Sequence, residues 1–130
     1  MKRTKLMAIG ILLIAALTLA GCSLAPVVDP DAPVASISFD EPVFLDIKVL
    51  FNGGASIDPD GGDIVYGYWD FGDGNSVEGE WALGFNPVIY VSHTYVQTGP
   101  YTGPYTYTVS LLVRDDEGSF GRTERTVNVR

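Results

Sequence analysis

The stretch Tyr68–Gly74, with the sequence YWDFGDG, decides the fold of this chain. Side chains alternate between the two faces of a β-strand, so Trp69 and Phe71 share one face while Asp70 lies on the other. The Gly72–Gly74 segment follows at once, and its glycines and aspartate supply the backbone angles that a tight turn needs. The pattern indicates a buried strand that ends abruptly in a turn, as in the core of a small β-sandwich.

Beyond residue 32 the spacing of apolar residues is typical of strands, and no helical stripe occurs. Turn signals lie at residues 56–63 and 115–118. About seven short strands separated by turns predict an all-β sandwich in a single domain. The expected strands cover residues 34–39, 45–51, 64–71, 76–81, 88–91, 107–113 and 126–130. In two of them the apolar side chains should point inward: Leu45, Ile47, Val49 and Phe51 in one, and Val127 and Val129 in the other. Tyr107, Val109, Leu111 and Val113 should share one face of their strand.

The first 22 residues have the three-part layout of a helical signal peptide. A basic start, MKRTK, precedes an apolar run from Leu6 to Leu19 that is too short to span a bilayer comfortably. The following LAGC, which ends at Cys22, resembles a bacterial lipobox. That resemblance implies cleavage before Cys22 and a lipid such as palmitate on its thiol. The alternative is an ordinary secretory signal followed by a chance cysteine.

Three parts are therefore expected: a signal peptide over 1–22, an extended tether over 23–32 and one domain over 33–130. The tether contains prolines and small residues without periodicity, and in an extended conformation it reaches about 30 Å. Cys22 is the only cysteine of the chain, so the domain has no internal disulfide. Its stability must come from core packing, or from packing and a bound ion.

The charge of the chain excludes several kinds of partner. Eight Lys and Arg oppose 16 Asp and Glu, and loss of Lys2, Arg3 and Lys5 with the signal leaves five basic residues and a net charge of −11. Such a domain repels nucleic acid backbones and anionic lipid head groups, and it attracts divalent cations. The other interpretation is a solvated acidic surface that only aids solubility.

Four motifs follow one another along the domain: Phe51–Gly61 (FNGGASIDPDG), Trp69–Gly74 (WDFGDG), His93–Tyr95 (HTY) and Tyr107–Gly118 (YTVSLLVRDDEG). Together they resemble a PKD domain, and the resemblance covers residues 33–130. It implies an immunoglobulin-like β-sandwich. Gly67 departs from the family, which usually has an aromatic residue there, and Gly53 and Gly54 stand where Ala and Ser are usual. The segments 75–92 and 97–105 are long for the family.

The residues that catalysis needs do not gather in any recognisable motif. His93 is the only histidine, and no serine or cysteine has a nucleophile motif around it. We expect His93 to be a turn residue that bonds backbone groups, and Tyr95 to anchor that turn like the tyrosine corner of related sandwiches. No zinc-ligand spacing or phosphate-binding loop occurs. The sequence predicts a protein that is not an enzyme.

Acidic loops should meet at one end of the sandwich. The candidate calcium ligands there are Asp58, Asp60, Asp63, Asp115 and Asp116, and Asp29 and Asp31 should lie at the same end. Calcium takes six to eight oxygen ligands. Some bacterial PKD domains bind calcium, so the resemblance permits such a site. Otherwise Asp58–Gly61 is only an Asx-type turn. Asp70 and Asp73 belong to the opposite end, where Asp73 should accept backbone N–H bonds within its own turn.

A lipid anchor at the acidic end would leave the opposite end pointing away from the membrane. Both long segments should lie near that distal end. Exposed aromatic side chains at loop tips are favoured contact residues. The alternative is that Trp81 and Phe85 fold back and cover a sheet edge. The candidate contact residues are Trp81, Phe85, Tyr101 and Tyr105, with Tyr90 nearby.

These observations favour a non-catalytic lipoprotein of the cell envelope whose PKD domain mediates extracellular protein or carbohydrate interaction. Ser23, rather than an aspartate, follows the cysteine, which resembles lipoproteins sorted to the outer membrane. The alternative is a structural subunit or spacer of an envelope complex, stabilised by calcium. A hydrolase is the third and weakest hypothesis, because the chain offers a single histidine.

Overall fold

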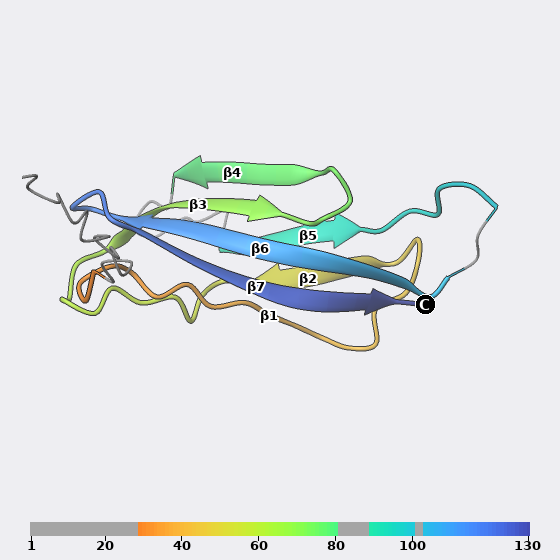
Figure 1. Cartoon of the computed structure of the whole chain (residues 1–130), viewed down its shortest axis with the longest axis horizontal. Helices are drawn as coiled ribbons and strands as arrows, with labels where there is room; N and C mark the ends of the chain where they lie inside the picture. Colours follow the sequence, from red (N-terminus) through yellow and green to blue (C-terminus); the bar gives the residue numbers. More distant parts are fainter. Residues whose placement is uncertain (1–28, 81–88, 101–102) are drawn as a thin grey trace, which may run out of the picture.

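The computed structural model describes residues 29–80, 89–100 and 103–130, and their regular secondary structure consists of seven strands (Figure 1). The prediction of an all-β sandwich is confirmed. All pairs of neighbouring strands are antiparallel. One sheet has the order β1-β2-β5, formed by Ser38–Phe39, Lys48–Asn52 and Tyr90–Thr94. The other has the order β4-β3-β6-β7, formed by Ser76–Glu80, Ile64–Asp70, Tyr105–Asp115 and Phe120–Val129.

The core lies between the sheets, where strand alternation predicts it. Trp69 and Phe71 are buried, while Asp70 on the opposite face of β3 is half-buried. Phe51 of β2 packs against the rings of Trp69 and Phe71, with centroids 6.0 and 5.5 Å apart, so it joins the two sheets. The four-stranded sheet adds Val109, Leu111, Val113, Val127 and Val129, all fully buried.

The first two strands are shorter than predicted. Of residues 34–39, only Ser38 and Phe39 form a strand, and Val34 makes an isolated bridge to Ile57. β2 begins at Lys48, because Asp46 has a φ of 58° and breaks the extended backbone before it. The expectation that Ile47 points inward is therefore wrong, and its side chain is 58% exposed.

The last strand is longer than predicted. β7 begins at Phe120 rather than at residue 126, and it pairs with β6 over ten residues. Its first half carries polar residues and Gly121, so it lacks the apolar alternation of Val127 and Val129. A Cβ at residue 121 would collide with the carbonyl oxygen of Pro33, so the close approach of the N-terminal segment explains the glycine.

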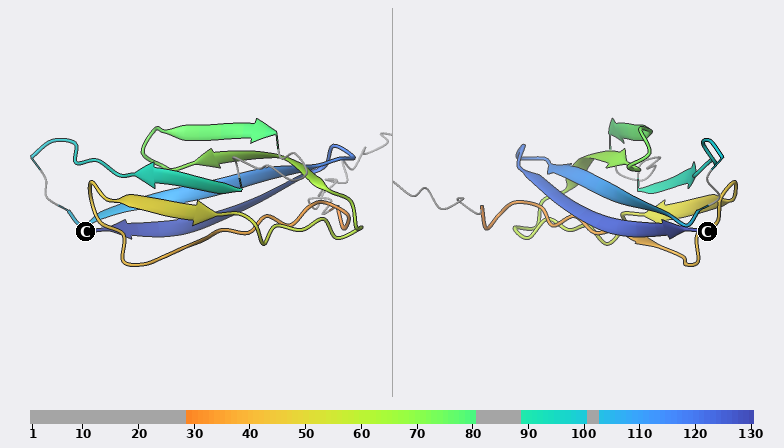
Figure 2. Two further views of the ribbon diagram at one scale, coloured as in Figure 1. Left: turned by 180° about the vertical axis from the view of Figure 1, so that it is seen from behind. Right: turned by 45° about the vertical axis from the view of Figure 1, so that its right-hand side comes forward.

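The loops between the strands gather at two opposite ends of the sandwich (Figures 1 and 2). We call the end formed by residues 29–34, 56–63 and 115–119 the acidic end. The far end holds the turn 71–75, the loops 40–47 and 95–100, and the C-terminus. The hydroxyl of Ser119 donates to Oδ2 of Asp29 over 3.4 Å, which ties the N-terminal segment to the acidic end. In the described residues no helix is long and apolar enough to cross a membrane.

Candidate functional site

His93 lies inside β5, so the expectation that it is a turn residue is wrong. Its Nε2 is 2.7 Å from Oδ2 of Asp73, and both side chains are about nine-tenths buried. The imidazole stacks on the ring of Phe71 at 4.1 Å and meets Tyr95 edge-on at 4.7 Å. The imidazole is thus held by packing and by a hydrogen bond to Asp73, which gives His93 a structural role that connects the two sheets.

Asp73 and Tyr95 complete this connection. As predicted, Asp73 accepts the N–H of Asn75 within its own turn, at 3.1 Å. Burial alone would raise the pKa of Asp73, but the hydrogen bonds from His93 and Asn75 outweigh it and hold that pKa below its usual value. The hydroxyl of Tyr95 donates to the carbonyl of Phe71 over 3.1 Å and 24 residues of sequence, so Tyr95 links β5 to the end of β3.

At the acidic end, the structure brings together only part of the candidate calcium set. Oδ2 of Asp58 and Oδ1 of Asp116 each lie 2.6 Å from the position that a Cβ at Gly62 would take, and Oδ1 of Asp60 lies 3.4 Å from it. Oδ2 of Asp58 is buried and makes no hydrogen bond within the described residues. Burial, and then the neighbouring Asp60, raise the pKa of Asp58.

The other candidate ligands have different tasks. Asp115 is buried, and its Oδ1 accepts the N–H of Ser119 at 2.7 Å. Asp63 pairs its backbone with Asp116, while its own side chain is exposed. Across the described ranges, no three His, Cys, Asp or Glu side chains are arranged to hold a metal ion. The donor chemistry at Asp58, Asp60 and Asp116 suits calcium, but the calcium site stays a prediction.

Three of the four candidate contact residues, Trp81, Phe85 and Tyr101, lie outside the described residues. Tyr105 begins β6 at the far end, and its half-buried ring stacks on Tyr107 with centroids 6.2 Å apart. One face of the Tyr105 ring is therefore occupied by packing within the domain. Tyr90 is 56% exposed on the outer face of the three-stranded sheet.

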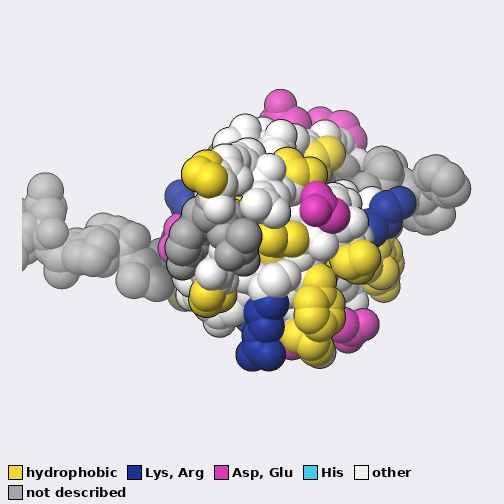
Figure 3. Space-filling view, turned by 90° about the vertical axis from the view of Figure 1, so that its right-hand side faces the viewer, with side chains coloured by type: hydrophobic (Ala, Val, Ile, Leu, Met, Phe, Trp, Pro, Cys, Tyr) yellow, Lys and Arg dark blue, Asp and Glu magenta, His cyan; other side chains and the backbone are white. Residues whose placement is uncertain are grey.

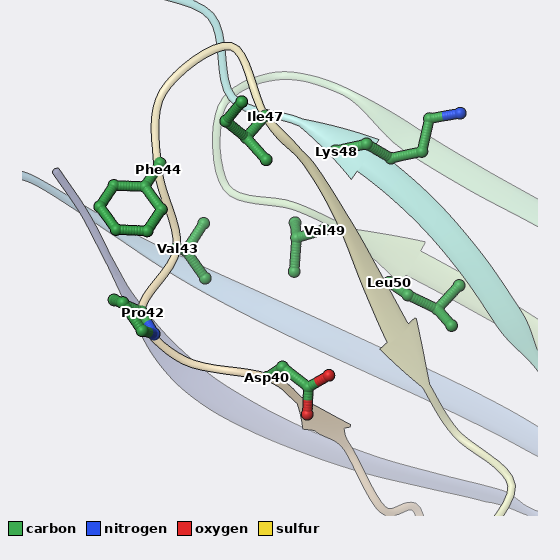
Figure 4. Close-up of a pocket in the computed structure, with 8 residues that line it drawn as sticks. All are labelled: Asp40, Pro42, Val43, Phe44, Ile47, Lys48, Val49 and Leu50. Carbon is green, nitrogen blue, oxygen red and sulfur yellow. The ribbon is translucent and has the colours of Figure 1, made fainter.

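Two hollows lie beside β2. One, of about 250 Å³, lies between the loop 40–47 and β2, and Figure 4 shows Leu50, Ile47 and Phe44 among the residues around it. The other, of about 190 Å³, lies between Leu50 and Tyr90. Leu50 and Asp40 line both hollows, so the two are adjacent. We call this surface the β2 groove.

Exposed apolar side chains and fixed polar groups border the β2 groove. Leu50 is 56% exposed, and the register pairs Asn52 with Tyr90 beside it. Oδ1 of Asn52 accepts the N–H of Gly54 at 2.7 Å, which fixes the orientation of the amide. Figure 3 views the far end, where hydrophobic side chains gather in groups between isolated charged ones.

The sequence contains a signal for this groove that the alternation of side chains along the strands does not reveal. Leu50 interrupts the polar face of β2, between Lys48 and Asn52, where a solvated strand face would carry a third polar residue. The sequence places Tyr90 in the expected strand 88–91 and near the candidate contact residues, but not beside Leu50. The pairing of Asn52 with Tyr90, which puts Tyr90 beside the groove, depends on strand register and could not be read from spacing.

Comparison with known proteins agrees with the fold. A family model described as a PKD domain matches residues 30–130. Collagenase ColQ1 from Bacillus cereus (strain Q1) is 32% identical over 99 residues, which are 76% of this chain and only 9% of the collagenase. The chain thus corresponds to a small part of that enzyme.

Two solved structures extend the comparison. The PKD1 domain of Vibrio anguillarum Epp is 31% identical, with a TM-score of 0.55, and the match covers 76% of this chain and 94% of that domain. A structure from a study of carbohydrate-binding modules of the β-sandwich superfamily is 34% identical, with a TM-score of 0.59, over 78% of this chain and 35% of that one. With the motifs, the two sheets and the family match in agreement, this chain belongs to the PKD domain family.

Proposed function

We propose that this chain is an exported lipoprotein, lipid-anchored to the cell envelope at Cys22, whose PKD domain binds an extracellular carbohydrate or protein without catalysing a reaction. The observation that carries the proposal is the β2 groove, in which exposed Leu50 lines two adjacent hollows and exposed Tyr90 lines one of them. Solvent-exposed apolar and aromatic side chains grouped around a hollow are characteristic of ligand-binding surfaces.

The chemistry of the groove suits a sugar chain. A tyrosine ring offers an apolar face for a pyranose, and carboxylate, amide and hydroxyl groups offer hydrogen bonds to sugar hydroxyls. Tyr90 supplies the ring, while Asp40, Asn52 and Ser38 line the same hollow. The similarity to the carbohydrate-binding modules supports this assignment. The match to a segment of a collagenase makes a collagen-like protein the second ligand class to test.

The orientation of the domain supports an extracellular contact. The described chain begins at the acidic end, where Asp29 meets Ser119, so a tether over 23–32 would join the membrane to that end. The hollow beside Phe44 and Ile47 lies toward the far end, next to the loop 40–47. A ligand there would be reached from outside the envelope, on the outer membrane or at the cell surface.

Sedimentation of residues 23–130 with insoluble chitin, xylan, cellulose or collagen tests the proposal. Leu50→Ala and Tyr90→Ala should each reduce binding about tenfold, as expected for central contact residues. Ile57→Ala is the matched control, because Ile57 is equally exposed at the acidic end. Retained binding in both groove variants, or equal loss in the control, would refute the groove as the site.

We also keep calcium as a proposed stabilising ligand of the acidic end, where the side chains of Asp58, Asp60 and Asp116 would have to rearrange to bind it. Its support is the buried Oδ2 of Asp58, which makes no hydrogen bond within the described residues. This proposal fits the alternative role of the domain as a spacer or subunit of an envelope complex. In that role a rigid acidic end matters more than a ligand groove.

A further inference from the structure

The outer face of the four-stranded sheet carries half-buried aromatic and apolar side chains beside charged ones, arranged in rows across the strands. The register aligns Glu78 of β4, Tyr68 of β3, Leu112 of β6 and Arg122 of β7 in one row. These residues point outward, because their sequence neighbours Trp69, Leu111 and Val113 are fully buried in the core.

The next row also begins with a glutamate and a tyrosine, but its basic and apolar residues stand in the reverse order. It contains Glu80, Tyr66, Arg114 and Phe120. The guanidinium of Arg114 lies 5.6 Å from the centre of the Tyr66 ring and 4.0 Å from a carboxylate oxygen of Glu80. Phe120 is 55% exposed. Both rows therefore run from an acidic edge at β4, over an aromatic ring, to an apolar or basic edge at β7.

We propose that this face binds a second copy of the chain about a twofold axis that is parallel to the strands. Such an axis reverses the order of strands, so β4 of one copy faces β7 of the other. Glu78 then meets Arg122 of the second copy, and Tyr68 meets Leu112. In the next row the ring of Tyr66 meets the guanidinium of the second copy's Arg114, a cation–π pair, and Glu80 meets Phe120. Each of these contacts occurs twice.

The alternative twofold axis, across the strands, matches the face poorly. It would place β4 of one copy against β4 of the other, so that the glutamates Glu78 and Glu80 meet glutamates. The parallel axis also keeps both acidic ends on the same side. Two copies tethered to one membrane through residues 23–32 could therefore pair side by side, with both β2 grooves facing outward.

The pairing is expected to be weak in solution, because one face of a four-stranded sheet is smaller than a standard stable interface. Arg122 already pairs with Glu124 of its own strand at 2.7 Å, which further limits the gain. Confinement of both copies to one membrane would raise their effective concentration and favour the pair.

Sedimentation equilibrium of residues 23–130 tests the proposal. The strands and the buried core lie within this range, and the Vibrio PKD1 domain of similar extent was solved by itself. Glu78→Arg and Arg122→Glu should each weaken dimerisation about tenfold, since each places like charges in contact. The double variant restores opposite charges and should return to within about threefold of the unmodified protein.

Leu112→Asp provides a second variant at the centre of the face, and Leu50→Asp is its control on the opposite sheet. Circular dichroism identifies any variant that does not fold. Dimerisation lost with Leu112→Asp and kept with Leu50→Asp supports the proposal. A protein that stays monomeric up to about 1 mM, a double variant no better than the single ones, or equal loss with Leu50→Asp overturns it.

Discussion

The side chains of His93 and Asp73 meet in a hydrogen bond between the two sheets, with Nε2 2.7 Å from Oδ2 and both side chains 11% exposed. His93 belongs to β5 of the three-stranded sheet, and Asp73 belongs to the turn that follows β3 of the other sheet. The motifs WDFGDG and HTY have 18 residues between them in the sequence, and they therefore meet as one structural unit.

This pair predicts a specific loss of stability in acid. The pKa of Asp73 is lower in the folded protein than in the unfolded chain, so its charge stabilises the fold above the unfolded value of about 4. That contribution disappears as the pH falls through the lower folded value. Asp73→Asn should reduce the free energy of unfolding at pH 7 by about 1–3 kcal/mol. The melting temperature of the variant should also fall less as the pH is lowered. If the melting temperature of Asp73→Asn fell with decreasing pH as steeply as that of the original protein, this assignment would be contradicted.

Gly72 and Gly74 provide a matched test of the turn. Both have positive φ, 77° and 91°, but a Cβ at Gly72 would lie 2.5 Å from the carbonyl oxygen of Thr108, whereas a Cβ at Gly74 meets nothing within 4 Å. Gly74→Ala should cost about 1–2 kcal/mol of stability through backbone strain alone. Gly72→Ala should cost clearly more, because β6 must shift. Denaturant unfolding measures both, and equal losses would show that the close approach to Thr108 is unimportant.

Tyr95→Phe tests the link between β5 and β3. It removes the hydroxyl that donates to the carbonyl of Phe71 and keeps the fully buried ring. The free energy of unfolding should fall by about 1–2 kcal/mol, since a buried carbonyl loses its donor. Fluorescence of buried Trp69 reports whether the core stays packed. A variant as stable as the original protein would mean that this hydrogen bond contributes nothing.

Calcium titration tests the acidic end. Ion binding to the folded state should raise the melting temperature of residues 23–130, and a chelator should reverse the rise. Asp58→Asn removes one charge of a carboxyl whose pKa is raised by burial and by Asp60, so without calcium the variant should melt at the same or a higher temperature. With calcium the rise should be lost. If calcium leaves the melting curve of the original protein unchanged, the ion site does not exist.

Much of the fold could be predicted because it depends on local patterns. Trp69 and Phe71 alternate with Asp70, and β6 alternates in the same way, so the core follows from side-chain direction alone. The length of β2 could not be predicted, because Asp46 adopts a positive φ that an aspartate shows only in some contexts. The need for a glycine at position 121 could not be predicted either, because it depends on the backbone of Pro33, which is distant in sequence.

The functional surfaces were harder to predict than the core. The partner of His93 lies 20 residues away and reaches it only through the packing of two sheets, so spacing suggested a turn instead. Leu50 and Tyr90 become neighbours through the register of β2 and β5, and the rows around Tyr68 depend on four strands at once. Strand register is set by tertiary packing, which one sequence does not display.

The most direct test of the proposed binding function is an NMR titration of residues 23–130 with chitohexaose, xylohexaose, cellohexaose and a collagen-like peptide. We expect at least one probe to shift the amide signals of Leu50, Asn52 and Tyr90 at the β2 groove while the signals of the four-stranded sheet stay in place. Binding whose shifts avoid the groove, or no shift at the groove with any of these probes, would contradict the account.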